Sequence, residues 1–123
     1  MKLPQQNRGG ALSETASTNL VRGTVDLLVL RALRQGPMHG FSVARWIRDH
    51  SREVLSFEDA ALYQSLHRLE RKGMVSSSWG RSDNNRRARF YQLTAKGRKR
   101  LETEMEAFHT YADAITRLLG PDS

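Results

Sequence analysis

The sequence contains no cysteine, and only three of its 123 residues are proline. Without cysteine the chain cannot form disulfides, cysteine-ligated zinc sites or iron–sulfur clusters, and it has no thiol nucleophile. Long apolar runs are also missing, because the most apolar stretch, 25–33, already contains Asp26 and Arg31, whereas a membrane span needs about 18 apolar residues in succession. The N-terminus lacks the apolar core of a signal peptide. We therefore expect one soluble, cytoplasmic domain.

Patterns that carry catalysis or bind metals are absent as well. No serine lies in a Gly-x-Ser-x-Gly turn, and no glycine-rich phosphate loop precedes a helix. The four histidines do not have the spacing of metal ligands, and we expect them in turns or at the surface: His39, His50, His67 and His109. The sequence therefore predicts no enzyme activity, no cofactor and no metal site.

Positive charge is concentrated in one segment. The chain has 20 Lys and Arg against 13 Asp and Glu, a net charge of +7. The window 81–100 contains one acid, Asp83, and eight bases, namely Arg81, Arg86, Arg87, Arg89, Lys96, Arg98, Lys99 and Arg100. Its net charge is also +7, so the rest of the chain is balanced. This favours binding to a polyanion over the alternative of a solvated loop and helix start.

The first half of the chain predicts an arm followed by two helices. Residues 1–19 are rich in small and polar residues and predict a flexible arm. Thr24 is a suitable N-cap for a helix that Gly36-Pro37 ends. After a turn at 37–40, a second amphipathic helix of about three turns runs from Phe41 to near Ser51.

A third helix has clear start and stop signals. Ser56 and Asp59 have the spacing of a capping box, and Gly73 is a C-terminal stop. Leucines at 62, 66 and 69 share one face, which predicts that this face packs inward. The opposite face, with Tyr63 at its flank, carries Ala60, Gln64, His67, Arg68 and Arg71.

Two strands, 74–79 and 87–93, are separated by turn-forming residues and predict a β-hairpin. Alternation places Arg87 and Arg89 on one face of the hairpin, with Arg86 at its tip. Trp79 lies at the base of the hairpin and Trp46 on the second helix. Aromatic residues at such positions usually belong to the core, so we expect both tryptophans there.

Thr94 caps a last helix, 95–119, whose apolar residues recur at steps of four and three. This seam consists of Leu101, Met105, Phe108, Ala112, Ile115 and Leu119. A helix of about 25 residues spans nearly 38 Å and extends beyond a body of some seventy residues. We therefore expect part of the seam to pair with a second copy of the chain.

Three helices followed by a basic hairpin have the order of a winged helix-turn-helix. The expected fold is mainly α with a small hairpin (α+β): a DNA-binding domain at 20–94, a dimerisation helix at 95–119 and a tail at 120–123. In this fold the third helix enters the major groove, and the hairpin, or wing, lies on the backbone or minor groove. The predicted DNA-binding residues are Ala60, Tyr63, Gln64, His67, Arg68, Arg71, Arg81, Arg86, Arg87 and Arg89.

The chain resembles the PadR family of bacterial transcriptional regulators. The resemblance covers about 20–101 and rests on four ordered stretches: GTVDLLVLRAL (23–33), GPMHGF (36–41), LYQSLHRLERKG (62–73) and RRARFYQLTAKG (86–97). It implies a homodimeric repressor on palindromic operator DNA, associated with the bacterial nucleoid and released by a small molecule or another signal. It also places Tyr63, His67 and Arg68 on the recognition helix.

This sequence departs from the family pattern at two points. Gln64 stands where the family commonly has proline, and an amide there can read a base. The chain has one C-terminal helix, as in the short branch of the family, where an effector could enter between the DNA-binding domain and the dimer helices. Phe108 and Tyr111 are the aromatic residues placed to meet it, although packing in the seam is the alternative role of Phe108. Two other functions stay open: an adaptor whose basic patch docks an acidic protein, and a protein that mainly senses a small molecule.

Overall fold

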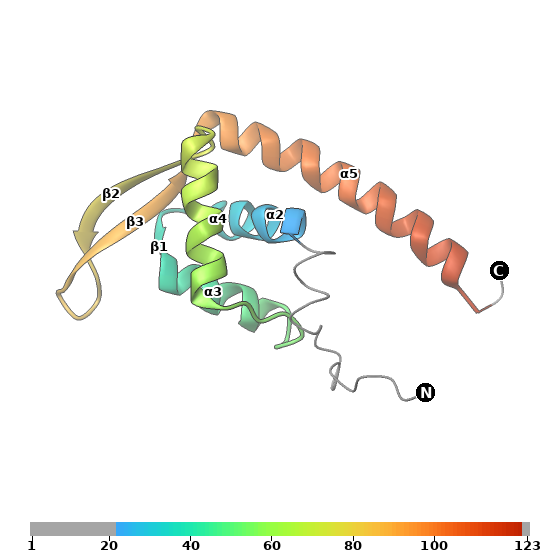
Figure 1. Cartoon of the computed structure of the whole chain (residues 1–123), viewed down its shortest axis with the longest axis horizontal. Coiled ribbons are helices and arrows are strands. Elements are labelled where there is room, and N and C mark those ends of the chain that lie inside the picture. Colours follow the sequence, from blue (N-terminus) through green and yellow to red (C-terminus); the bar gives the residue numbers. More distant parts are fainter. Residues whose placement is uncertain (1–21, 122–123) are drawn as a thin grey trace.

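The computed structural model describes residues 22–121 (Figure 1). The predicted arm at 1–19 lies outside the described residues, as does the end of the predicted tail. The elements are, in chain order, α2 (Arg22–Leu33), β1 (Met38–His39), α3 (Gly40–His50), α4 (Asp59–Arg71), β2 (Val75–Arg81), β3 (Arg87–Leu93) and α5 (Ala95–Leu119). The expected class, α+β with a winged helix-turn-helix, is confirmed.

Helices α2, α3 and α4 pack around one apolar core. Helix α2 is apolar on several sides because it lies between α3, α4 and α5. From α4 the inward leucines are those the spacing predicts, and all are buried: Leu62, Leu66 and Leu69. In Figure 1, α4 lies across α2 and α3, the β2–β3 hairpin projects on one side and α5 extends on the other. This arrangement leaves the outer face of α4 uncovered beside the hairpin.

The expected starts of two helices are wrong. Helix α2 already includes Arg22, so Thr24 lies inside it instead of capping it. Helix α4 begins at Asp59 with Glu58 at the N-cap, not in a capping box at Ser56. The later start of α4 results from tertiary packing. Leu55 and Phe57 pack against the core, and residues 55–58 form no regular structure.

The predicted stop of α4 at Gly73 is confirmed. Gly73 has a φ of 77°, a left-handed conformation that glycine adopts without strain. Its N–H donates to the carbonyl of Glu70, and the N–H of Met74 donates to that of Leu69. This is a Schellman motif, in which two of the last helical carbonyls find partners. The motif turns the chain directly from α4 into β2.

The sheet has three antiparallel strands in the order β1-β3-β2. Strand β3 has the expected bounds, whereas β2 runs from Val75 to Arg81, two residues further toward the turn than expected. The structure also corrects the expectation of a plain turn at 37–40. Met38 and His39 form a short strand against Tyr91 and Phe90, because the free edge of β3 offers backbone partners.

Helix α5 begins inside the core and leaves it. The Thr94 side chain accepts a hydrogen bond from the N–H of Gly97, as expected for an N-cap. Leu101 is buried, and Met105 packs against the core. These two residues of the predicted dimer seam therefore contact their own chain. Beyond them the helix extends away from the body (Figure 1).

Candidate nucleic-acid interface

The outer face of α4 is open to solvent along the helix. Its exposed side chains, all expected there, are those of Ala60, Tyr63, Gln64, His67 and Arg71. They can supply hydrogen-bond donors and acceptors, an aromatic ring and a positive charge, which are the groups that contact base edges and phosphates. Their roles in DNA binding stay a prediction. One expected member of this face, Arg68, behaves differently.

The Arg68 side chain turns toward α2 and binds Asp26. Its Nη2 lies 2.6 Å from Asp26 Oδ1, and its Nε donates to Oδ2 at 3.2 Å. The hydroxyl of Ser65, which is fully buried, donates to the same carboxylate at 2.6 Å. The hydrogen bond with Asp26 raises the pKa of Arg68 further, against the opposing effect of desolvation. Asp26 therefore fixes α4 to α2 through two residues one turn apart.

Tyr63 is positioned by the start of α3. A Cβ atom at Gly40 would lie 2.5 Å from the Tyr63 ring, so a larger residue there would displace the ring from its present position. The ring remains partly exposed at the flank of α4. Because Gly40 is the first residue of α3, the Tyr63 ring lies where α3 begins beside α4 in the helix-turn-helix.

The wing arginines gather around one exposed tryptophan. The expectation that Trp79 belongs to the core is wrong, since 56% of its surface is exposed. It lies on β2 directly opposite Arg89 on β3. The Arg87 and Arg89 guanidinium carbons lie 4.5 and 5.5 Å from its ring centroid, within the range of cation–π contacts. The expected shared face of these two arginines is therefore confirmed.

Trp79 lies outside the core because of its position along the strand. On this face of the sheet, Val75 and Leu93 are buried at the base of the hairpin, and Ser77 comes next. Ser77 donates to Glu70 of α4 at 2.6 Å and accepts from Arg89 at 3.0 Å. Trp79 is the next residue on this face, and the described residues leave more than half of it exposed. The cationic face of the wing is thus the face that turns toward α4.

The tip of the wing is a tight turn. The N–H of Asn85 donates to the carbonyl of Ser82, and the N–H of Ser82 donates to that of Arg86. Asn85 has a φ of 64°, which asparagine tolerates better than most residues. Arg81 is exposed and donates to the carbonyl of Asn85, and Arg86 is exposed at the tip, as expected.

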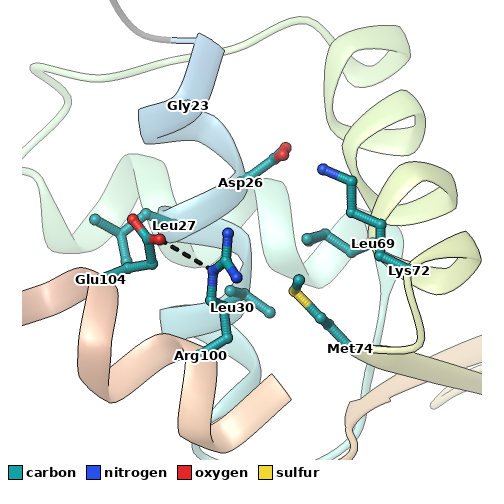
Figure 2. A pocket seen from close by; sticks show the side chains of 9 residues that line it. All are labelled: Gly23, Asp26, Leu27, Leu30, Leu69, Lys72, Met74, Arg100 and Glu104. Carbon is teal, nitrogen blue, oxygen red and sulfur yellow. Dashed lines mark ion pairs between the residues drawn. The ribbon is translucent and has the colours of Figure 1, made fainter. Parts of the chain in front are cut away.

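A cleft of about 220 Å³ lies between α2, α4 and α5 (Figure 2). Leu27, Leu30, Leu69 and Met74 supply apolar surface, and charged side chains surround it: Asp26, Lys72, Arg100 and Glu104. Arg100 pairs with Glu104 at 3.0 Å. The expected effector residues, Phe108 and Tyr111, do not line this cleft and are exposed further along α5. Their role stays a prediction.

The outer part of α5 carries an uncovered apolar strip. Phe108 and Ile115 of the predicted seam are exposed, and so is Leu119, together with Tyr111 and Leu118. Ala112 between them is partly exposed. Within residues 22–121, no helix is long and apolar enough to cross a membrane.

Sequence reasoning missed the groups that hold the interface together. Asp26 and Glu70 bind arginines, and neither was expected to have a role. A signal was present for Asp26, because a carboxylate inside the apolar stretch 25–33 needs a partner when it is partly buried. The partner itself is 42 residues away, and spacing alone does not identify it.

Comparison with known proteins identifies relatives of this chain. Residues 29–103 match the family described as "Transcriptional regulator PadR-like family". An uncharacterised protein from Lysinibacillus sphaericus is 23% identical over 81 residues, which are 66% of this chain and 74% of that protein.

Solved structures share the fold over most of the chain. A transcriptional regulator from Clostridium thermocellum is 26% identical, with a TM-score of 0.74 over 84% of this chain and 97% of that one. A PadR family regulator from Eggerthella lenta is 28% identical, with a TM-score of 0.71 over 87% of this chain and 91% of that one.

Proposed function

Because the chain belongs to the PadR-like family of transcriptional regulators, whose members are not enzymes, we propose that it is a homodimeric repressor of transcription. In this proposal α4 reads bases in the major groove of operator DNA, and the wing contacts the adjacent backbone or minor groove. Bound over a promoter, the dimer blocks transcription until a small molecule or another signal releases it.

One observation carries the DNA-binding part of this proposal. The exposed face of α4 and the cationic face of the wing lie side by side. Ser77 of β2 donates a hydrogen bond to Glu70 of α4, and Arg87 and Arg89 lie on the same face of the sheet as Ser77. A duplex lying along α4 would therefore meet base-reading groups and cations together. The positive charge that neutralises phosphates supplies much of the affinity of such proteins.

The uncovered strip on α5 supports the dimer. A single winged helix offers only one recognition helix, whereas a two-fold dimer presents two to half-sites about 34 Å apart. Phe108, Ile115 and Leu119 leave apolar surface exposed on a helix that extends beyond the domain. Burying that strip against a second copy would remove it from water and bring the two recognition helices into one assembly.

Release by a signal is proposed through the boundary between the domain and α5. The cleft in Figure 2 lies between α2, α4 and α5. Asp26 lines this cleft and also forms an ion pair with Arg68 of α4. An occupant of the cleft could therefore alter both the recognition helix and the dimer helix. The same cleft is what favours the alternative of a protein that mainly senses a small molecule.

The proposal is tested by selecting bound duplexes from a random DNA pool and measuring affinity for the selected site against salt concentration. We expect a palindromic site and a steep log–log dependence, with a slope of about −0.9 for each phosphate neutralised. Absence of duplex binding, or binding that does not change with salt, would contradict the DNA-binding proposal. Binding to acidic proteins without any preference for duplex DNA would instead support the adaptor alternative.

Repression is tested separately by transcription in vitro from a promoter that overlaps the selected site. We expect the protein to lower transcript yield in proportion to site occupancy. An increase in yield at the same occupancy would show an activator. A small molecule that co-purifies with the protein from its own host, detected by native mass spectrometry, and that restores transcription would support release by an effector.

A further inference from the structure

The two arginines stacked on Trp79 differ in their other contacts. Arg89 donates to Ser77 at 3.0 Å, and its Nη2 lies 3.8 Å from Glu70 of α4. Arg87 is exposed, and among residues 22–121 no carboxylate lies within ion-pair distance of it. One guanidinium is therefore tied to α4, while the other rests on the Trp79 ring without a carboxylate beside it.

Trp79 itself has little part in the core. More than half of its surface is exposed, and the buried residues on its face of the sheet end before it. A side chain in such a position gains less from burial than one inside the core. Its best-defined contacts are with the two guanidinium groups, which the negative face of the indole ring attracts.

We propose that Trp79 is a positioning residue that assigns different tasks to the two arginines. It holds Arg87 extended on the wing, where Arg87 contacts DNA, while Arg89, bound by Ser77 and Glu70, joins the wing to α4 and makes no DNA contact. This inference rests on the proposed DNA-binding function. It adds to that function that DNA contacts Arg87 and not Arg89, and that Trp79 positions Arg87 for this contact.

The physical reason is the cost of ordering a long side chain. An arginine loses rotamer freedom when it binds, and that loss weakens binding. A guanidinium that already rests on an aromatic ring has lost part of this freedom in the free protein. In the same way, the Glu70–Ser77–Arg89 contacts hold the wing and α4 at a fixed separation before DNA arrives.

The test is a double-mutant cycle on the duplex selected by the wild-type protein. Trp79→Ala should weaken binding about two- to tenfold, the range expected when one long side chain must be ordered on binding. In an Arg87→Ala background the same change should have no further effect, because Trp79 acts through Arg87. Trp79→Phe keeps an aromatic face and should restore most of the affinity, whereas Trp79→Leu should not. Ser78→Ala, on the opposite face of β2, is the matched control and should bind like the wild type.

Salt dependence separates the roles of the arginines and excludes a merely structural effect. Arg87→Ala should reduce the magnitude of the log–log slope by about 0.9 for each phosphate that Arg87 neutralises, whereas Trp79→Ala and Arg89→Ala should leave it unchanged. Trp79→Ala should melt only a few degrees below the wild type and should remain fully folded at the temperature of the binding assay.

Two sets of results would overturn the inference. Additive effects of Trp79→Ala and Arg87→Ala, or a slope that falls equally in Arg89→Ala, would refute the division of tasks while leaving DNA binding intact. Failure of the wild-type protein to bind any duplex would refute the proposed function itself.

Discussion

Asp26 on α2 and Arg68 on α4 form a bidentate ion pair, although 42 residues separate them in sequence. The closest atoms, Arg68 Nη2 and Asp26 Oδ1, lie 2.6 Å apart. Both side chains are largely shielded from water, and the buried hydroxyl of Ser65 shares the same carboxylate. Bidentate pairs of this kind fix orientation as well as distance. The Asp26 contacts therefore orient α4 relative to α2. They are made on the side of α4 that faces α2, opposite its outer face.

Replacing Asp26 should destabilise the fold. Asp26→Ala leaves the Ser65 hydroxyl without its acceptor and Arg68 without its partner, which should cost about 2 kcal/mol. Asp49→Ala is the matched control, because Asp49 pairs with Arg48 at 3.6 Å with both side chains about half exposed, and such pairs contribute about 0–1 kcal/mol. Urea unfolding measures both changes. Equal losses in the two variants would show that the Asp26 network is not a structural tie.

Local signals predicted most of the fold, and tertiary contacts account for what they missed. The Gly73 stop, the Thr94 cap and the hairpin depend on neighbouring residues, and all were predicted. The predicted start of α4 was wrong because Phe57 packs on a core formed by distant residues. Strand β1 was missed because two residues form a strand only when a free edge, here that of β3, is available to pair.

Gly97 should not tolerate a side chain. A Cβ atom there would overlap the carbonyl oxygen of Met74, which is backbone and cannot rotate away. Gly97→Ala should therefore cost about 3 kcal/mol or more, because α5 must move off the domain. Gly23→Ala is the control in another helix, where nothing lies within 4 Å. It should stabilise the protein by about 0.5–1 kcal/mol, and thermal unfolding distinguishes the two signs.

The outer face of α4 and the tip of the wing should differ in their effect on DNA binding. Gln64→Ala should relax preference at one base pair, since a bidentate amide contact contributes about 1–3 kcal/mol of discrimination. Arg86→Ala should weaken binding to all duplexes and reduce the magnitude of the salt slope by about 0.9 for each phosphate that Arg86 neutralises. Affinities for the selected site and for single-base variants test both. The opposite pattern would mean that the wing reads sequence and α4 does not.

For the candidate site, the sequence predicted which residues are exposed better than what they contact. Helical and strand periodicity placed Gln64, His67 and Arg87 on their faces. Periodicity also placed Arg68 outward, but its long side chain reaches back to Asp26. The reach of a side chain and the location of its partner depend on tertiary structure, so the Asp26 and Glu70 contacts could not be derived from spacing.

Charges on the outer part of α5 should separate the proposed dimer. Phe108→Asp with Ile115→Asp places two carboxylates in the uncovered apolar strip and should yield a monomer that remains folded, because neither side chain belongs to the core. Thr103→Asp with Thr110→Asp is the matched double variant. At about 100° per residue, these two positions lie on the side of the helix opposite Phe108 and Ile115. Light scattering measures the mass of each. A wild-type mass for the Phe108 and Ile115 variant would refute the seam.

Leu101 requires a different expectation although it belongs to the same seam in sequence. It is buried in its own domain. Leu101→Ala should therefore cost about 2–5 kcal/mol of stability. Size-exclusion chromatography below the unfolding transition should show the native oligomeric mass.

Tyr91 should make the protein lose stability at alkaline pH. Burial raises the pKa of Tyr91, and this effect exceeds the opposing influence of the positive charge on Arg89. In the unfolded chain the phenol ionises near its ordinary pKa of about 10, whereas in the folded protein it still retains its proton. The unfolded state thus binds fewer protons above about pH 10, and the free energy of unfolding falls as pH rises from there through the folded pKa.

Tyr91→Phe removes this titration while keeping the ring in the core. Between about pH 9.5 and 11, the wild-type stability should fall more steeply than that of the variant, and below about pH 9 the two curves should run parallel. Urea unfolding at each pH supplies both curves. Tyr111→Phe is the control, because Tyr111 is exposed on α5 and this change keeps Tyr91, so the alkaline loss should stay in place. Identical slopes for the wild type and Tyr91→Phe above pH 10 would show that another group causes the alkaline loss.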